Sequence, residues 1–212
     1  MPGPDDLVKL QVAAFAAATA ARTPTPGGGS VAGVVGALAA ALGEMALAFT
    51  RGKKAFAQHE ADYAGVAARL ESARRAFLDL VAEDARAYEA FQQAAQYQGP
   101  DKPAKMKSAL QAAIAVPRQM SRQAMAILAD LDSLTGRCNK WLLSDLAAGA
   151  VLAEAVVRLC DLNVKINAGQ LDNQDEGRKA LAQSEDDLAA ARKLAGEIEK
   201  ECGLRMADSR GG

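Results

Sequence analysis

One carboxylate occupies a position where the sequence pattern predicts an apolar side chain. Within a predicted helix over about 57–97, the residues of one seven-residue column are Tyr63, Leu70, Phe77, Asp84 and Phe91. A carboxylate on such a column loses hydration, which raises its pKa toward the range useful for proton transfer. Asp84 is therefore the candidate catalytic residue, acting as a general acid or base. The alternative is an aspartate that pairs with a core lysine or arginine, or that turns outward at the edge of the column.

A glycine-rich turn is the second candidate for a binding site. Its residues are Pro26, Gly27, Gly28, Gly29 and Ser30. Prolines and glycines predict a non-helical segment over 23–30, with Ser30 as the N-cap of the next helix. Backbone N–H groups at a helix start can bind an anion or a polar ring edge, although a tight turn between packed helices is the alternative. The GxGxxG and P-loop patterns are absent, so a nucleotide site is not expected.

Two pairs of polar residues are further candidates. Lys53 and Lys54 follow the second predicted helix, where they would attract an acidic group or simply complement the helix dipole. Asn163 and Asn167 are four residues apart and continue the apolar face of a later helix. Their carboxamides can bind the donors and acceptors of a flat heterocycle, and core amides bonded to backbone are the alternative.

The remaining candidates are weaker. Asn139 and the Ser144–Asp145 pair are polar residues near a predicted helix start that could bind a heterocycle in the same way. For Ser144 and Asp145, helix capping is the alternative role. His59 is the only histidine, which argues against a catalytic zinc site, and no metal is predicted. Cys138 lies near a turn, but nothing in its surroundings predicts a reactive thiolate.

These residues must be positioned by helices. The predicted helices cover about 5–22, 31–51, 57–97, 104–134, 144–168 and 175–201. In the second of them, small residues recur at spacings of three and four, from Gly33 to Gly43, so it should pack closely at the centre of the molecule. Pro117 is expected to kink or split the fourth. The predicted fold is an all-α antiparallel helical bundle with long central helices, a single domain over 1–205 and a flexible tail over 206–212.

The composition narrows the class of protein. Half of the residues are hydrophobic but only 4% are aromatic, and alanine dominates, which favours closely packed helices. Lysine and arginine (25) nearly balance aspartate and glutamate (26), so nucleic acid is not an expected partner. The stretch 31–50 is long but only weakly apolar, so no membrane partner is expected. Three cysteines and the lack of a signal-like start predict a cytoplasmic protein.

Taken together, these motifs resemble the cyclodeaminase/cyclohydrolase family. The matching segments are Pro24–Val31 (PTPGGGSV), Thr50–Lys54 (TRGKK), Glu83–Tyr88 (EDARAY), Val116–Pro117, Asn139 with Ser144–Asp145, and Asn163–Asn167 (NVKIN). They occur in the expected order, and the resemblance as a whole covers about residues 7 to 200. One departure is Cys138, which stands where the family usually has glycine.

The resemblance implies a homodimer that acts on a tetrahydrofolate derivative without a prosthetic group, with Asp84 as the catalytic residue. In that setting the turn over 27–30 would shape the pocket, Lys53 and Lys54 would attract the folate glutamate, and the asparagines would help to hold the pterin. The expected activity is that of methenyltetrahydrofolate cyclohydrolase, since the chain lacks a transferase domain. The alternatives are a 5-formiminotetrahydrofolate cyclodeaminase that releases ammonia, and a non-catalytic folate-binding or structural dimer.

Overall fold

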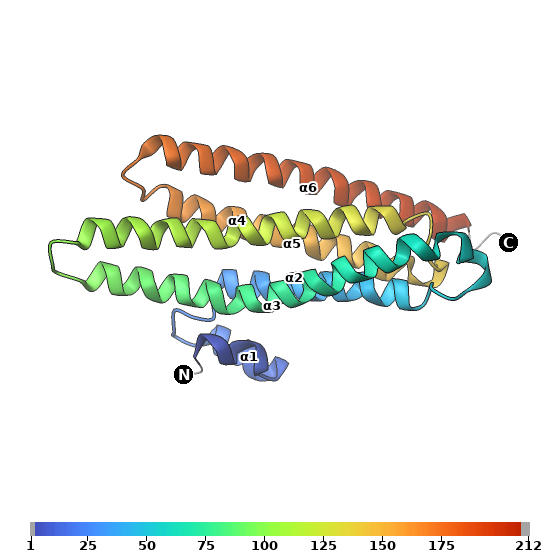
Figure 1. Ribbon diagram of the computed structural model, residues 1–212, viewed down its shortest axis with the longest axis horizontal. Helices are drawn as coiled ribbons and strands as arrows, with labels where there is room; N and C mark the ends of the chain where they lie inside the picture. Colours follow the sequence, from blue (N-terminus) through green and yellow to red (C-terminus); the bar gives the residue numbers. More distant parts are fainter. Residues whose placement is uncertain (1–2, 209–212) are drawn as a thin grey trace.

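The chain folds into an up-and-down helical bundle (Figure 1). The computed structural model describes residues 3–208. The α-helices are α1 (Val12–Ala20), α2 (Gly28–Ala48), α3 (Glu60–Gln96), α4 (Lys102–Leu134), α5 (Leu143–Ala168) and α6 (Gln174–Asp208). Short 3-10 helices cover Pro4–Lys9, Lys54–His59 and Lys140–Leu142. Helices α2 to α6 alternate in direction, and no strand occurs within 3–208. The predicted all-α antiparallel bundle is confirmed.

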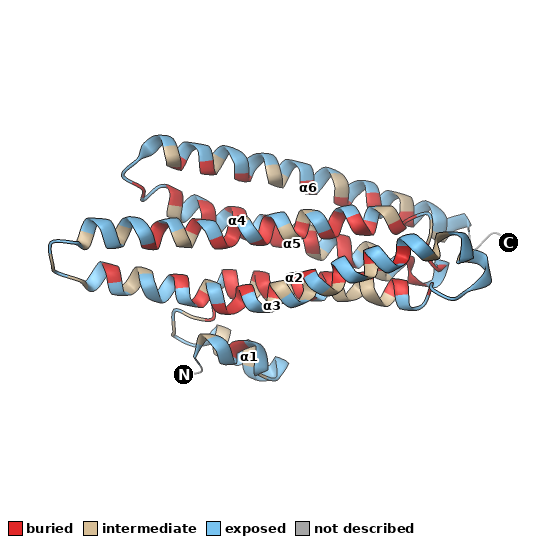
Figure 2. Cartoon of the chain, viewed as in Figure 1, coloured by how far each residue is buried: buried red, intermediate tan, exposed pale blue. Residues whose placement is uncertain are grey.

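Small residues let the central helices approach closely, as predicted. Helix α2 packs against α3 and α5, and α4 lies against both α3 and α5. A Cβ atom on Gly33 would lie 2.6 Å from Val81 Cγ2 of α3, and one on Gly43 would lie 2.8 Å from Leu131 Cδ2 of α4. The face of α2 that carries Gly33 and Gly43 therefore packs against α3 and α4 of the same chain. Figure 2 shows the buried residues along the facing sides of the long helices.

The apolar character of α2 follows from this packing. By length and composition, α2 is the one helix within 3–208 that could cross a membrane. Half of its most apolar 18-residue window is nevertheless buried against the other helices of the bundle.

Two predictions for the first 30 residues are wrong. The expected helix over 5–22 is interrupted at Leu10 and Gln11, whose backbones are extended. Leu7, in the 3-10 helix Pro4–Lys9, is buried against α3, whereas α1 has no buried residue. Ser30 is not an N-cap, because α2 already begins at Gly28 and Gly27 takes that position. Small residues are favoured here because α3 approaches this helix start closely.

Helix α4 is continuous through Pro117, so of the two expected effects of this proline, a kink or a split, the split is wrong. A proline has no N–H group to donate to the carbonyl four residues earlier, here that of Ala113. Asn167 of α5 donates to this Ala113 carbonyl from its Nδ2 atom at 3.1 Å. A side chain from the neighbouring helix thus replaces the backbone hydrogen bond that Pro117 removes.

The ends of α2 and α6 also differ from the predicted helix ends. Helix α2 ends at Ala48 rather than near 51, and the following turn closes at Gly52 with a φ of 73°. Helix α6 continues to Asp208, well past the predicted end at 201, because Cys202 and Met206 pack against the core. Of the predicted tail over 206–212, residues 206–208 are therefore helical, and 209–212 lie outside the described residues.

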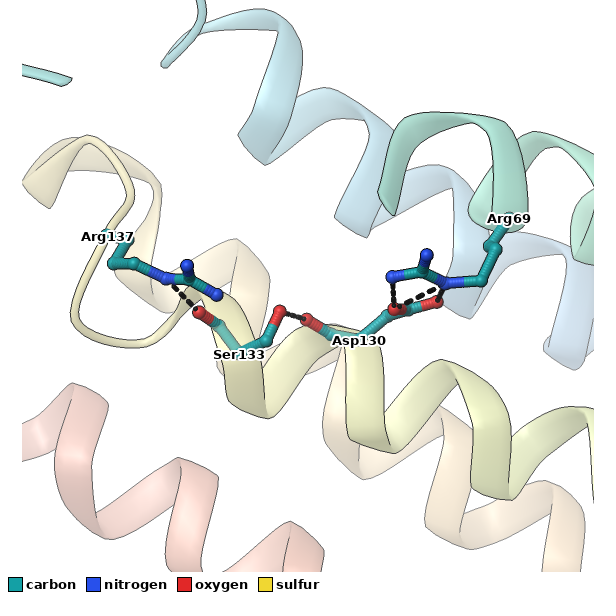
Figure 3. Close-up of polar contacts among 4 residues, drawn as sticks. All are labelled: Arg69, Asp130, Ser133 and Arg137. Atoms are coloured by element: carbon teal, nitrogen blue, oxygen red, sulfur yellow. Dashed lines mark hydrogen bonds and ion pairs between the residues drawn. The ribbon is translucent and has the colours of Figure 1, made fainter. Parts of the chain in front are cut away.

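An ion pair between the exposed Arg69 of α3 and the buried Asp130 of α4 joins these two helices (Figure 3). Asp130 is buried, and its two carboxylate oxygens accept hydrogen bonds from Arg69 Nε at 3.0 and 3.2 Å. The Ser133 hydroxyl donates to the Asp130 carbonyl at 2.7 Å, and Arg137 Nε donates to the Ser133 carbonyl at 2.8 Å. Asp130 therefore has the cation partner that a structural role for Asp84 would require.

Candidate active site

Asp84 lies where α3 crosses the N-terminus of α2. Ser30, in the first turn of α2, donates from its hydroxyl to Asp84 Oδ2 at 3.0 Å. A Cβ atom on Gly29 would overlap the Asp84 carboxylate, so only glycine permits this approach. The glycine-rich turn and the aspartate, 54 residues apart in sequence, therefore form one site.

The environment of Asp84 suits proton transfer. Burial raises the pKa of the Asp84 carboxyl above its ordinary value of 3.8, while hydrogen bonds from the Ser30 hydroxyl and amide oppose this shift. No lysine or arginine within 3–208 forms an ion pair with Asp84. The alternative of a buried ion pair is thus not what the structure shows, in contrast to Asp130.

A cavity of about 260 Å³ opens beside Asp84. Three helices line it: Ala87, Tyr88 and Phe91 from α3, Ala113 and Val116 from α4, and Asn163, Ile166, Asn167 and Gln170 from α5. The walls are mainly apolar, with one carboxylate and several amides, as in a site that binds a flat polar ring. A larger cavity of about 460 Å³ lies between α4 and α6 and contains none of the predicted site residues.

Both predicted asparagines of α5 line this cavity, and both also have structural bonds. Asn163 Nδ2 donates to the Leu159 carbonyl at 3.0 Å, and Asn167 Nδ2 donates to that of Ala113. A Cβ atom on Gly28 would lie 4.0 Å from Asn163 Nδ2, so the start of α2 is adjacent. The two interpretations of these amides, ligand binding and backbone support, are therefore compatible.

The remaining predicted site residues lie at the opposite end of the bundle. They are Lys53, Lys54, Asn139, Ser144 and Asp145. Lys53 and Lys54 follow the C-terminus of α2, whereas Ser30 is at its N-terminus (Figure 1). A helix of 21 residues separates the two groups by about 30 Å. Within one chain the structure does not bring these residues to Asp84.

Asn139 bonds the segment before α5 to the turn after α2. Its backbone N–H donates to Thr50 Oγ1 at 2.9 Å, and its Nδ2 donates to the Phe49 carbonyl at 3.3 Å. It also caps the short helix Lys140–Leu142 by accepting from the Trp141 N–H. Ser144 and Asp145 lie in the first turn of α5 and do not cap it, because the N-cap is Leu142.

Several cavity residues were not among the predicted site residues. Phe91 is the next member of the heptad column after Asp84, and Tyr88 lies one helical turn after Asp84. Their spacing from Asp84 could therefore have indicated both as site residues. Spacing along one helix does not indicate Val116, Ile166 or Gln170, because only the packing of α4 on α5 brings them to the cavity. Val116 and Ile166 do lie within segments that resemble the family.

Burial makes the cysteines poor candidates for this chemistry, although Cys160 lies close enough to Asp84 for that carboxylate to add to the rise in the pKa of its thiol. Burial raises the pKa of both Cys138 and Cys160 to about 12, which disfavours a reactive thiolate in either. No group of three potential histidine, cysteine, aspartate or glutamate ligands occurs among the described residues 3–208.

Asp84 and Ser30 lead to a prediction about pH. If the carboxylate form of Asp84 is the working base, kcat/KM should rise with pH through a pKa above 3.8. The Ser30 hydroxyl lowers this pKa, so Ser30→Ala should move the acid limb of the profile to higher pH. A pH profile of the two proteins measures this shift, and an unmoved limb would contradict the assignment of Asp84 as the titrating group.

The chain is similar in sequence to several known proteins. Residues 11–186 match the model of the formiminotransferase-cyclodeaminase family. A methenyltetrahydrofolate cyclohydrolase of Methylorubrum extorquens is 32% identical over 178 residues, which cover 81% of this chain and 86% of that protein. The formimidoyltransferase-cyclodeaminase of Gallus gallus is 30% identical over 174 residues. The matched region covers 79% of this chain and 32% of that longer protein.

A solved structure extends the match to the whole fold. The formiminotetrahydrofolate cyclodeaminase of Thermotoga maritima superposes with a TM-score of 0.86 at 30% identity, covering 93% of this chain and 98% of that one. The chain belongs to the formiminotransferase-cyclodeaminase family, and it is an enzyme of the cyclodeaminase/cyclohydrolase type.

Proposed function

We propose that this protein is a methenyltetrahydrofolate cyclohydrolase, which converts 5,10-methenyltetrahydrofolate to 10-formyltetrahydrofolate. The observation that carries the proposal is the Asp84 carboxyl, which lies beside a mainly apolar cavity with a serine hydroxyl and no cation partner within 3–208. The cyclohydrolase of Methylorubrum extorquens supports it, because the match covers most of both chains. The folate derivative is the substrate, and the proposed reaction uses no prosthetic group.

The geometry supports a mechanism with one carboxyl group. Asp84 accepts a proton as water adds to the methenyl carbon between N5 and N10. The protonated carboxyl then donates this proton to N5 as the bond from the carbon to N5 breaks. The added hydroxyl loses its proton to solvent, which leaves the formyl group on N10. A raised pKa suits both steps, because the group must accept and return a proton near neutral pH.

The surrounding residues have separate roles in this mechanism. The Ser30 hydrogen bond orients the carboxylate toward the cavity, and Gly29 leaves room for it. Phe91 and Val116 supply apolar walls for the ring system, and Asn163 and Asn167 supply amides from α5.

A second activity, cyclodeamination of 5-formiminotetrahydrofolate, is favoured by the close superposition on the Thermotoga maritima cyclodeaminase. In this reaction N10 attacks the formimino carbon, and ammonia leaves as the methenyl bridge forms. The formimino group reacts in its protonated amidinium form, and Asp84 would accept the N10 proton and donate it to the departing nitrogen, which then leaves as ammonia. Because Asp84 would have the same role in both reactions, the two activities are distinguished by which folate the enzyme converts.

The experiment that tests the proposal supplies each folate separately. With methenyltetrahydrofolate, we expect its absorbance to disappear faster than in buffer. With formiminotetrahydrofolate, we expect neither ammonia nor methenyl absorbance above the control. Ammonia release from the second substrate alone would favour the cyclodeaminase, and binding of both folates without turnover would support the non-catalytic alternative.

We also propose that the protein is cytoplasmic and works as a homodimer. Cys138, Cys160 and Cys202 are free thiols, which suits a reducing compartment. Exposed apolar side chains on α2 (Leu38 and Phe49) and on α5 (Leu162 and Ile166) support the dimer.

A further inference from the structure

The amide side chains of α5 at the Asp84 cavity share one hydrogen-bonding pattern. Each donates its NH2 group to a main-chain carbonyl, at distances between 3.0 and 3.2 Å. Only the NH2 end of a carboxamide can donate to a carbonyl, so these bonds fix which end of each amide is the nitrogen and which is the oxygen. The residues are Asn163, Asn167 and Gln170.

The oxygens of these amides are left for a ligand. None of the three oxygens accepts a hydrogen bond from another residue within 3–208. Asn163 and Asn167 are half-buried, and no half-buried or buried residue in that range has an enclosed side-chain oxygen without a partner. Both oxygens are therefore accessible. With the Asp84 carboxylate, they give the cavity a set of hydrogen-bond acceptors.

The orientation of Asn167 depends on a proline in the neighbouring helix. A carbonyl inside a helix normally accepts from the N–H group four residues later, which for Ala113 would be that of Pro117. Because proline has no N–H group, this carbonyl is available, and Asn167 Nδ2 donates to it. Asn163 differs, since its acceptor lies four residues earlier in its own helix.

Pro117 does not itself reach the ligand space. It is buried in α4, and the residues of α4 that line the cavity are Ala113 and Val116. Any effect of Pro117 on a ligand must therefore pass through a neighbouring group. The Ala113 carbonyl and the Asn167 amide form the direct connection from Pro117 to the cavity.

A set of acceptors selects a ligand edge that carries N–H groups. A reduced pterin has such an edge, formed by its 2-amino group and the adjacent N3–H. Amide oxygens complement this edge, whereas reversed amides would place NH2 groups against N–H groups and leave donors unpaired. A site built to accept hydrogen bonds also discriminates against an analogue that lacks the donor.

We propose that Pro117 is a positioning residue of the active site: by leaving the Ala113 carbonyl without its helical partner, it holds Asn167 with the amide oxygen toward the cavity, where the oxygens of Asn163 and Asn167 accept hydrogen bonds from the 2-amino edge of the pterin ring. The ligand part of this proposal rests on the proposed function. The positioning part does not, because the bond between Asn167 and Ala113 is present without a ligand.

Hydrogen exchange in the ligand-free protein tests the positioning part. In ¹⁵N NMR spectra, the side-chain NH2 signals of Asn167 are identified as those missing from Asn167→Leu. Their exchange with water should be about fivefold faster or more in Pro117→Ala, because the new main-chain N–H group competes for the Ala113 carbonyl. Pro103→Ala, in the first turn of the same helix, should leave the rate unchanged. An unchanged rate in Pro117→Ala would overturn the role of Pro117.

A double-mutant cycle tests whether this orientation matters to a ligand. The probe is 5-formyltetrahydrofolate, a stable folate with the same pterin ring. Pro117→Ala should raise its Kd by about 3- to 10-fold in the wild-type background and in Asn163→Leu. In Asn167→Leu the proline substitution should have no further effect, because no amide remains to be oriented. An equal rise in all three backgrounds would show a general packing effect and overturn the proposal.

A change in the ligand tests the acceptor edge. In the second probe a methyl group replaces the 2-amino group of the same folate, which removes the donors and keeps the shape. The wild type should bind this analogue about 5- to 10-fold more weakly than the 2-amino compound. Asn163→Leu/Asn167→Leu should bind the two compounds within about twofold of each other. Equal affinities in the wild type, or an undiminished preference in the double variant, would overturn the acceptor assignment.

The outcomes distinguish this proposal from the proposed function. A protein that binds and converts no folate would overturn the proposed function and the ligand part, while hydrogen exchange would still decide the role of Pro117. Normal folate turnover with unchanged exchange in Pro117→Ala would overturn the positioning role alone.

Discussion

Replacing Asp84 by asparagine should lower turnover of the folate substrate about 100- to 10,000-fold, with a much smaller change in substrate affinity. The amide keeps the shape of the side chain and can still contact Ser30, but it cannot accept and return a proton. Steady-state kinetics and equilibrium binding on the same variant measure the two effects separately. A fully active asparagine variant would rule out the proposed mechanism.

The stability of this variant gives an independent check. Burial raises the pKa of Asp84 in the folded state, so as pH rises the unfolded chain ionises first and the folded state loses stability relative to it. The asparagine variant should therefore be at least as stable as the wild type at neutral pH. The difference should disappear in acid below the ordinary aspartate pKa. Thermal unfolding at the two pH values measures this dependence.

Asp130→Asn is the matched control, because Asp130 is a buried carboxylate that does pair with a cation, Arg69. Its neutralisation removes a charge-assisted link between α3 and α4, and we expect a loss of about 1–3 kcal/mol in the free energy of unfolding. Turnover per folded molecule should change little. The opposite pattern, with Asp84→Asn unstable and Asp130→Asn inactive, would assign Asp84 a structural role.

Gly29→Ala should have the second largest effect, although it adds only one methyl group. The new Cβ atom would overlap the Asp84 carboxylate, so either this side chain or the first turn of α2 must move. A displacement of this kind disrupts the Ser30–Asp84 hydrogen bond, and we expect turnover to fall by about 100-fold or more. Kinetics and a crystal structure of the variant would show the loss and its cause.

Gly196→Ala is the control for this substitution. Gly196 lies within α6, and a Cβ atom there has no neighbour within 4 Å. Alanine should preserve turnover and stabilise the helix by about 1 kcal/mol, which differential scanning calorimetry can detect. If Gly29→Ala were equally harmless, the close approach of α2 to Asp84 would have no catalytic importance.

Local sequence pattern was sufficient for the fold class and for the main catalytic candidate. The heptad column that contains Asp84 predicted both a long helix and a partly buried carboxylate, because side chains seven residues apart lie on the same face of a helix. The spacing of small residues in α2 likewise predicted a closely packed central helix. These inferences depend only on helical periodicity, which the sequence contains in full.

Tertiary structure decided how the candidates are grouped. The sequence could not show that Ser30 bonds to Asp84 rather than capping α2, or that Asn167 satisfies the carbonyl that Pro117 leaves free, because both contacts join separate helices. It also could not show that Lys53 and Asp84 lie at opposite ends of the bundle. Helical periodicity determines the face on which a side chain lies, whereas its distance from residues on other helices depends on how those helices pack.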